Sequence, residues 1–114
     1  MLTPLKFSEL GKSDLIPQAI IRKPISYFEK EGRGYFVHDH DALDVFDGVA
    51  FLLDGLPFAL MHHRGSPADE TTVYLTRDST ADIDTLTDSI RHILAALQLP
   101  SESLVWQRKD DPEL

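Results

Sequence analysis

Apolar and polar residues alternate along the first third of the chain in a pattern typical of β-strands. In residues 18–28 the alternation sets four apolar side chains on one side: Ala19, Ile21, Ile25 and Tyr27. Pro24 cannot donate a backbone hydrogen bond, so we expect this strand at a sheet edge or with a bulge at that point. Turn-forming residues follow at 29–34 and an extended segment resumes at 35–38, which predicts a first β-hairpin.

A longer apolar stretch in the middle of the chain predicts a second hairpin. Residues 49–53 are continuously apolar, as expected of a strand buried on both faces, and residues 57–63 return as its partner. The Asp54-Gly55 pair between them is a strong signal for a two-residue hairpin turn. The aspartate-rich residues 40–48 are expected to form a loop or a single helical turn. Alternation in residues 71–76 predicts a further, half-buried strand.

Spacings of three and four residues predict one amphipathic helix near the C-terminus. Its apolar stripe consists of Ile83, Leu86, Ile90, Ile93, Leu94 and Leu97. Ser79 or Thr80 is the expected N-cap, and Asp82 and Asp84 suit the positive end of the helix dipole. Pro100 marks the expected end of this helix.

These elements predict a single α+β domain over residues 1–114. We expect an antiparallel sheet of about five or six strands, made of two hairpins plus a strand, with one long C-terminal helix packed on one face. A short final strand follows at 104–108, with Trp106 packed in the core against the helix. Residues 1–17 are expected to wrap the domain as a turn or short helix, and residues 109–114 to form a frayed tail.

One helix covers only one face of such a sheet. The other face must be sealed by the N-terminal segment or by a second subunit. A homodimer is therefore an expected state.

The composition excludes several kinds of chemistry and narrows the choice of partner. The chain has no cysteine, which excludes a disulfide framework, a thiolate nucleophile and a Cys-ligated metal or cluster. Its net charge is -8. The first 34 residues carry six Lys/Arg and four Asp/Glu, and the remaining residues carry five Lys/Arg and fifteen Asp/Glu. Binding to nucleic acid is not expected, because phosphate binding needs clustered basic residues. A basic protein is the expected partner.

Nothing in the sequence predicts export or a membrane span. The first residues lack a charged leader followed by a long apolar stretch. The longest apolar region, residues 48–61, is interrupted by Asp54, Gly55 and Pro57. We therefore expect a cytoplasmic protein.

Histidine and aspartate cluster in the middle of the chain and suggest a metal site. Residues two apart in a strand project to the same face, so His38 and His40 could bind one metal ion, with His63 or its neighbour His62 as a third ligand. Zinc, iron or nickel would suit such a site. The spacing Gly-x5-His-x-His-x3-Asp, from Gly32 to Asp44, resembles the first metal motif of the cupin family, which usually has Glu in the last position. The second motif of that family does not follow.

No catalytic constellation appears in the sequence. It contains neither a Gly-x-Ser-x-Gly elbow nor a glycine-rich phosphate loop, and no cofactor is expected. The leading hypothesis is a non-enzymatic protein-interaction or regulatory module, such as an immunity protein, an antitoxin-like inhibitor or an accessory adaptor. Acidic loops at 39–47 and 78–88 would steer a basic partner toward it. The alternative is a small metal-binding protein or metal-dependent enzyme that uses the histidine cluster.

Overall fold

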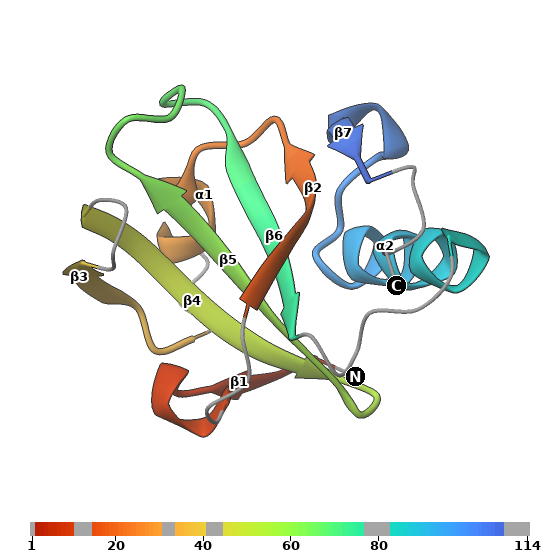
Figure 1. Cartoon of the computed structure of the whole chain (residues 1–114), viewed down its shortest axis with the longest axis horizontal. Helices are drawn as coiled ribbons and strands as arrows, with labels where there is room; N and C mark the ends of the chain where they lie inside the picture. Colours follow the sequence, from red (N-terminus) through yellow and green to blue (C-terminus); the bar gives the residue numbers. More distant parts are fainter. Residues whose placement is uncertain (1, 11–14, 31–33, 41–44, 77–82, 109–114) are drawn as a thin grey trace.

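The described part of the chain folds around one antiparallel β-sheet of seven strands, shown in the computed structural model of Figure 1. The structure describes residues 2–10, 15–30, 34–40, 45–76 and 83–108. The strands are β1 (Leu2–Leu5), β2 (Leu15–Ile21), β3 (Val37–His40), β4 (Val45–Leu53), β5 (Leu56–His63), β6 (Thr71–Thr76) and β7 (Leu104–Gln107). The helices are α1 (Ile25–Lys30), α2 (Ile83–Ala96) and the 3-10 helices Phe7–Leu10 and Ser101–Ser103.

The longest strands, β4 and β5, lie in the interior of the sheet. The spatial order is β1-β4-β5-β6-β2-β7, and β3 also pairs with β4. Residues 45–48 of β4 pair with β3 and residues 50–53 pair with β1. These two short strands therefore lie end to end along one edge of β4, while β7 forms the opposite edge of the sheet.

Because side chains alternate along each strand, the two faces of the sheet carry side chains of different size. One face, which we call the helix face, carries large buried side chains: Ile21, Val49, Phe51, Phe58, Leu60, Val73 and Leu75. The second face carries Ala50, Ala59 and Met61 beside Phe46, and Gly48 lies in the same alternating set. The sheet therefore has two separate hydrophobic cores, one on each face.

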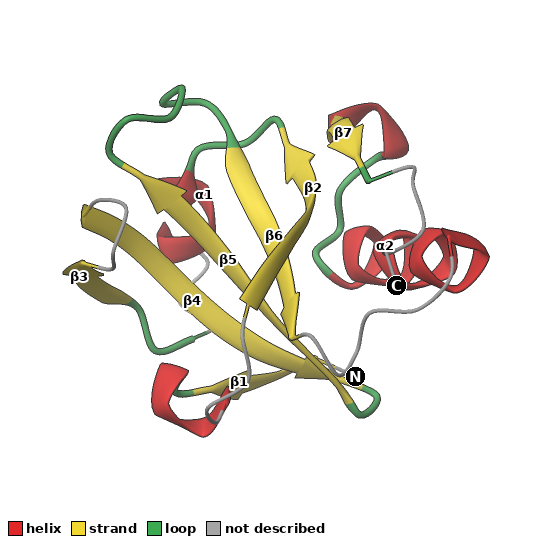
Figure 2. Ribbon diagram, in the orientation of Figure 1, coloured by secondary structure: helices red, strands yellow, loops and turns green. Residues whose placement is uncertain are grey.

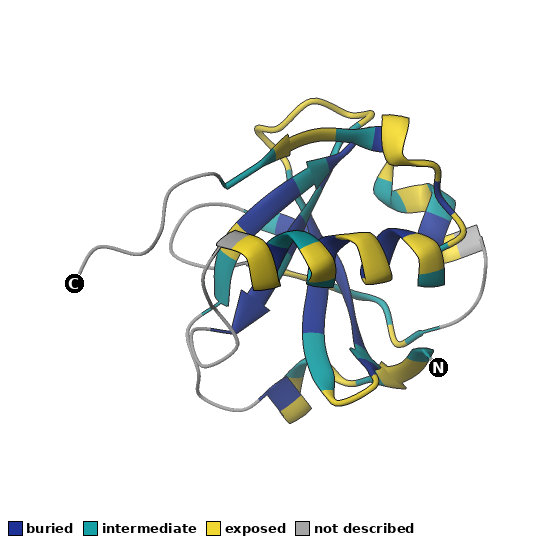
Figure 3. Ribbon diagram, turned by 90° about the vertical axis from the view of Figure 1, so that its right-hand side faces the viewer, coloured by how far each residue is buried: buried dark blue, intermediate teal, exposed yellow. Residues whose placement is uncertain are grey.

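The two α-helices cover the helix face (Figure 2). Four residues of the expected stripe on α2 are buried: Leu86, Ile90, Ile93 and Leu94. Figure 3 shows α2 lying across the strands with its exposed residues turned away from them. Phe28 of α1 is buried in the same core. The amphipathic stripe is confirmed for these residues, whereas the expected caps Ser79 and Thr80 lie outside the described ranges.

The predicted fold class is wrong in its strand count and in its single long helix. The sheet has seven strands in the described part, and α2 spans 14 residues, Ile83–Ala96. The helix ends before Pro100 because Gln98 adopts a left-handed conformation (φ 60°). The N–H of Gln98 donates to the Ala95 carbonyl and that of Leu99 to the Leu94 carbonyl. These two bonds form a Schellman motif, which satisfies carbonyls of the last turn.

The first predicted hairpin is also wrong. Strand β2 ends at Ile21 and pairs with β6 and β7, and residues 25–30 form the helix α1 instead of continuing the strand. Ile25 and Phe28 are three residues apart, a spacing that also fits one face of a helix, and both contact the core. Pro24 immediately precedes the helix, where its missing N–H costs nothing.

Residues 40–48, expected to be a loop, contain the start of a strand. β4 begins at Val45, and Val37–His40 pairs with residues 45–48. Aspartates at 39 and 47 suggested a loop, but they occupy strand positions whose side chains remain exposed or partly exposed. Residues 41–44 lie outside the described ranges.

The N-terminal segment covers part of the second face. This is one of the two alternatives that we expected, the other being cover by a second subunit. Phe7 and Leu10 pack in the second core, and the Phe7 ring centroid lies 5.9 Å from that of Phe46. The segment is more regular than a turn or short helix, because it also supplies β1 and the start of β2. Residues 109–114, the expected tail, are not described. In the described ranges, every helix is too short or too polar to cross a membrane.

Replacing Gly48 with alanine tests this packing. A Cβ at Gly48 would lie 2.7 Å from Cζ of Phe7 and 3.2 Å from the Leu60 carbonyl oxygen. We expect Gly48→Ala to lower the free energy of unfolding by about 1–3 kcal/mol, measured by urea denaturation. In a Phe7→Ala background the same change should cost less by at least about 0.5 kcal/mol. Strictly additive effects would show that Phe7 does not cover Gly48.

Candidate functional site

Three polar side chains form a row across neighbouring strands. In the sheet register His38 of β3 lies opposite Asp47 of β4, and Asp47 lies opposite His62 of β5. Asp47 belongs to the same alternating set as Val49 and Phe51, so the row continues the helix face. The side chains of His38 and Asp47 are 73% and 46% exposed. The row therefore lies just beyond the end of the hydrophobic core.

Hydrogen bonds determine which ring nitrogen of each histidine is protonated. Nδ1 of His38 lies 2.5 Å from Oδ1 of Asp47. Nε2 of His62 lies 3.2 Å and 3.1 Å from the carbonyl oxygens of Ser66 and Pro67. Carboxylate and carbonyl oxygens only accept, so these nitrogens are the donors. In the neutral rings Nε2 of His38 and Nδ1 of His62 therefore keep their lone pairs.

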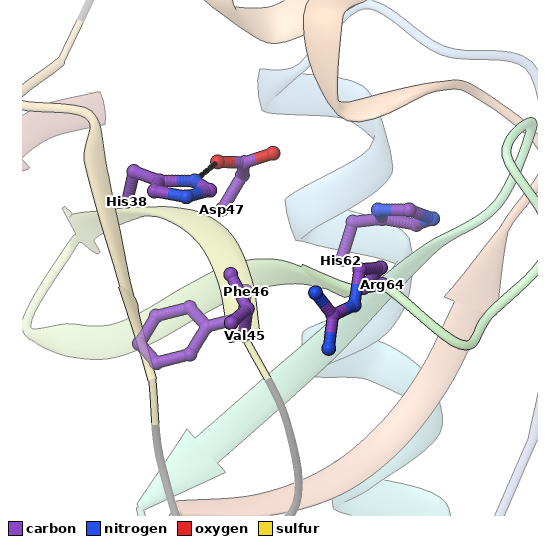
Figure 4. A pocket seen from close by; sticks show the side chains of 6 residues that line it. All are labelled: His38, Val45, Phe46, Asp47, His62 and Arg64. Atoms are coloured by element: carbon purple, nitrogen blue, oxygen red, sulfur yellow. Dashed lines mark hydrogen bonds and ion pairs between the residues drawn. The ribbon is translucent and has the colours of Figure 1, made fainter.

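The row lines a shallow pocket of ≈ 180 Å³, drawn in Figure 4. Val45, Phe46 and Arg64 complete the lining. Figure 4 shows His38 and Asp47 joined on one side of the pocket and His62 beside Arg64 on the other. A carboxylate-oriented imidazole can accept a proton or bind a metal ion. The polar groups of the lining are two imidazoles, one carboxylate and one guanidinium, and the six residues include no hydroxyl, thiol or amine nucleophile.

The predicted ligands His38, His40 and His63 are only partly brought together. His63 is paired with Phe46, on the second face, and its ring packs 5.6 Å from that of Phe46 and 6.4 Å from that of Tyr74. His62 and His63 thus face opposite sides, and the histidine of β5 that shares a face with His38 is His62. His40 is paired with Val45, but its side chain is outside the described part.

In the described residues no group of three or more His, Asp or Glu side chains is arranged to hold a metal ion. The predicted metal site includes His40, so it stays a prediction. The role of Asp47 was missed because residues 40–48 were expected to be a loop. The pairing of His62 with Asp47 depends on the strand register, which the sequence alone leaves open.

A second candidate surface is an uncharged strip on the second face. The backbone register places Ile20 of β2 between Trp106 of β7 and Thr72 of β6, and Pro17 opposite Tyr74. We call these five residues the open strip. Trp106 and Pro17 are exposed and the other three are partly exposed. The N-terminal 3-10 helix contacts β4 and β5, and Tyr74 packs at the border of the second core.

The prediction that Trp106 packs in the core is wrong. Trp106 is 44% exposed, and its neighbour Val105 is 41% exposed. The register between β2 and β7 shifts between Ile20 and Ile21. Gln107, the residue after Trp106, points toward α2, and its Nε2 donates to Oγ1 of Thr87 at 2.9 Å. Alternation then directs Trp106 to the opposite face, away from the helix.

A second hollow lies between the β4–β5 turn and α2. It is lined by Leu53, Asp54, Leu56, Ser89 and His92. A hydrogen bond from the amino-terminal group, together with its charge, lowers the pKa of Asp54, and His92 lowers it further. Asp54 is exposed, so this effect is not a sign of a catalytic carboxyl group.

No protein-family model matches this chain, and no curated protein sequence or solved structure is significantly similar to it. The resemblance of residues 32–44 to the cupin metal motif thus gains no support from these comparisons. Clues to function therefore come from the geometry of the histidine pocket and of the open strip.

The exposure of Trp106 can be tested directly, because it is the only tryptophan. We expect its fluorescence to be quenched readily by acrylamide. Trp106→Ala should change the free energy of unfolding by less than about 1 kcal/mol, as at most surface sites. Ile90→Ala, in the core, should cost about 2–5 kcal/mol. Weak quenching, or a cost for Trp106→Ala equal to that for Ile90→Ala, would contradict the exposed position.

Proposed function

We propose that this protein is a non-enzymatic interaction module that binds a basic partner protein over the open strip. The observation that carries the proposal is the exposure of Trp106 on the edge strand β7, next to exposed Val105. A large exposed aromatic side chain on a sheet edge is a liability unless a partner covers it. Tryptophan is also among the residues that contribute most to binding at interfaces.

The strip has the composition of the centre of a protein–protein interface. Its members are Pro17, Ile20, Thr72, Tyr74 and Trp106, and none is charged. Interface centres are depleted in charged residues and enriched in aromatic ones, and a polar rim surrounds them. A partner would bury this strip against apolar side chains of its own.

The charge of the remaining surface favours a basic partner over a second copy of the chain. The exposed acidic residues of the described part are Glu9, Glu29, Asp39, Asp54, Asp69, Asp84, Asp88 and Glu102. A chain with net charge -8 attracts a basic protein and repels its own copies at long range. The homodimer expected from the sequence stays a prediction, and it becomes less favourable because the N-terminal segment already covers part of the second face.

The proposal is compatible with an immunity protein, an antitoxin-like inhibitor or an accessory adaptor. Each of these acts by covering or recruiting another protein and needs no catalytic group. The expected cytoplasmic location also stays a prediction. Several residues of the two acidic loops expected to steer a partner lie outside the described ranges. Within those ranges, Asp84 and Asp88 are exposed on α2.

The proposal can be tested by affinity capture with matched variants. Purified wild-type protein, Trp106→Ala and the control Tyr35→Ala would each be used to capture proteins from the source cells. Tyr35 is 53% exposed but lies outside the strip. We expect a basic protein to be retained by the wild type and by Tyr35→Ala and to be lost with Trp106→Ala. In the reconstituted complex, the backbone amides of residues 104–107 should exchange hydrogen more slowly.

Two outcomes would contradict the proposal. One is a captured protein that binds Trp106→Ala as well as the wild type, because the strip would then not be the contact surface. The other is self-association of the wild type in analytical ultracentrifugation that Trp106→Ala abolishes. In that case the occupant of the strip is a second copy.

A further inference from the structure

We infer that the basic partner binds by adding an extended segment of its own chain as a further strand beside β7. This mode of binding rests on the function proposed above, and it names the part of the partner that lies next to Trp106. The occupant is a peptide segment that pairs through its backbone, and not a preformed surface that contacts side chains alone.

The outer edge of β7 has backbone groups that are directed away from the sheet. In the described part of the chain, β7 is the last strand on its side and pairs with β2. The N–H of Arg108 donates to the Gln18 carbonyl at 2.9 Å. Neighbouring residues of a strand direct their backbone groups to opposite edges, so the N–H and C=O of Gln107 point away from β2. The register shift also leaves Val105 without a partner residue in β2. This edge is therefore suited to backbone hydrogen bonds with another chain.

The side chains beside this edge favour strand pairing. Trp106, Ile20 and Thr72 form a row across β7, β2 and β6. A strand added to β7 would extend this row, because every second side chain would lie on the second face, next to Trp106. Aromatic and β-branched residues stabilise such cross-strand pairs. The partner segment should therefore carry valine, isoleucine or an aromatic residue opposite Trp106.

The length of the edge limits the segment that fits it. β7 is 4 residues long and contains a bulge, two features that restrict uncontrolled pairing of an edge strand. Lysine and proline, which also protect edges, are absent from Leu104–Gln107, and Val105 and Trp106 are 41% and 44% exposed. The edge is therefore suited to a short segment, roughly four to six residues long.

Charge brings the segment to the protein but does not fix its position. Glu102 is exposed two residues before β7, and Asp84 is exposed on α2, the helix that Gln107 contacts. Exposed Arg22 and Arg91 partly balance these two acids locally. The attraction therefore comes from the net charge of -8 of the whole chain, and backbone pairing beside Trp106 sets the position.

The test uses a phage-displayed library of random linear peptides of about ten residues, selected on immobilised wild-type protein. We expect the selected peptides to contain Lys or Arg and to alternate apolar with polar residues. A synthetic copy of a selected peptide should bind the wild type and the control Tyr35→Ala equally. It should bind Trp106→Ala at least about tenfold more weakly.

Methylation of the peptide backbone distinguishes strand pairing from contact through side chains alone. A strand turns its odd-numbered amides to one edge and its even-numbered amides to the other. One version of the peptide would be N-methylated at odd positions and a second version at even positions. We expect one version to bind at least about tenfold more weakly than the other, because only one set of N–H groups faces β7.

Substitutions at Gln107 test the same pairing from the side of the protein. Gln107→Pro removes the outward N–H, whereas the matched control Gln107→Ala keeps it, and both lose the bond to Thr87. We expect Gln107→Ala to bind the peptide within about threefold of the wild type, and Gln107→Pro at least about tenfold more weakly. Circular dichroism would verify that both variants fold. If Gln107→Pro does not fold, the methylated peptides decide.

Four outcomes would overturn strand addition. Equal binding of the two methylated peptides, with loss of both in Trp106→Ala, would mean that the open strip is a contact surface that does not pair as a strand. Peptides that bind Trp106→Ala as well as the wild type would mean that they pair elsewhere. Selection of no peptide would also contradict strand addition, whereas the capture experiment would still test the proposed function. Self-association of the wild type that Gln107→Pro abolishes and Gln107→Ala retains would make β7 of a second copy the occupant.

Discussion

The pairing of β4 with β5 is the interaction on which the rest of the structure depends. Eight residue pairs join the two strands, from Phe46–His63 to Leu53–Leu56. The connecting turn places Asp54 and Gly55 at φ 49° and 89°, the positive values that a type I′ hairpin turn requires. A turn of fixed length sets the register, and a slip of one residue would turn the side chains of one strand to the opposite face relative to the other strand. Large side chains of the helix face would then share a face with the small ones of the second face.

This register also determines where function can lie. It places Asp47 and His62 on the helix face and Phe46 and His63 on the second face. The helices cover the centre of one face, and Phe7 and Leu10 cover the β4–β5 region of the other. The histidine pocket and the open strip lie where these covers end. Both candidate sites are therefore consequences of a sheet that is larger than the elements packed on it.

Part of this fold could be predicted from the sequence. The Asp54-Gly55 turn and the spacing of Leu86, Ile90 and Ile93 are local signals, because turn geometry and helix periodicity depend on residues close in sequence. The segment after Ile21 was misassigned because Ile25 and Tyr27 alternate as in a strand, whereas Ile25 and Phe28 share one face of a helix, and only the packing of Phe28 in the core decides. Extended structure was expected at 35–38, which overlaps β3, but the start of β4 was missed because aspartates at an exposed sheet end resemble a loop.

The candidate site was less predictable than the fold for a related physical reason. His38 was recognised from its residue type, but its partners Asp47 and His62 come from other strands, and register is a long-range property. The exposure of Trp106 depends on the shift in register between β2 and β7, which no local pattern reveals.

Native-state hydrogen exchange tests the central position of the β4–β5 pair most directly. The account predicts that the amides of Val49, Phe51 and Leu60 exchange only by global unfolding, with a free energy equal to that from urea denaturation. The amides of the edge strand β7 should exchange through smaller openings at lower free energy. Exchange of the β4 and β5 amides at lower free energy than those of β7 would contradict the account.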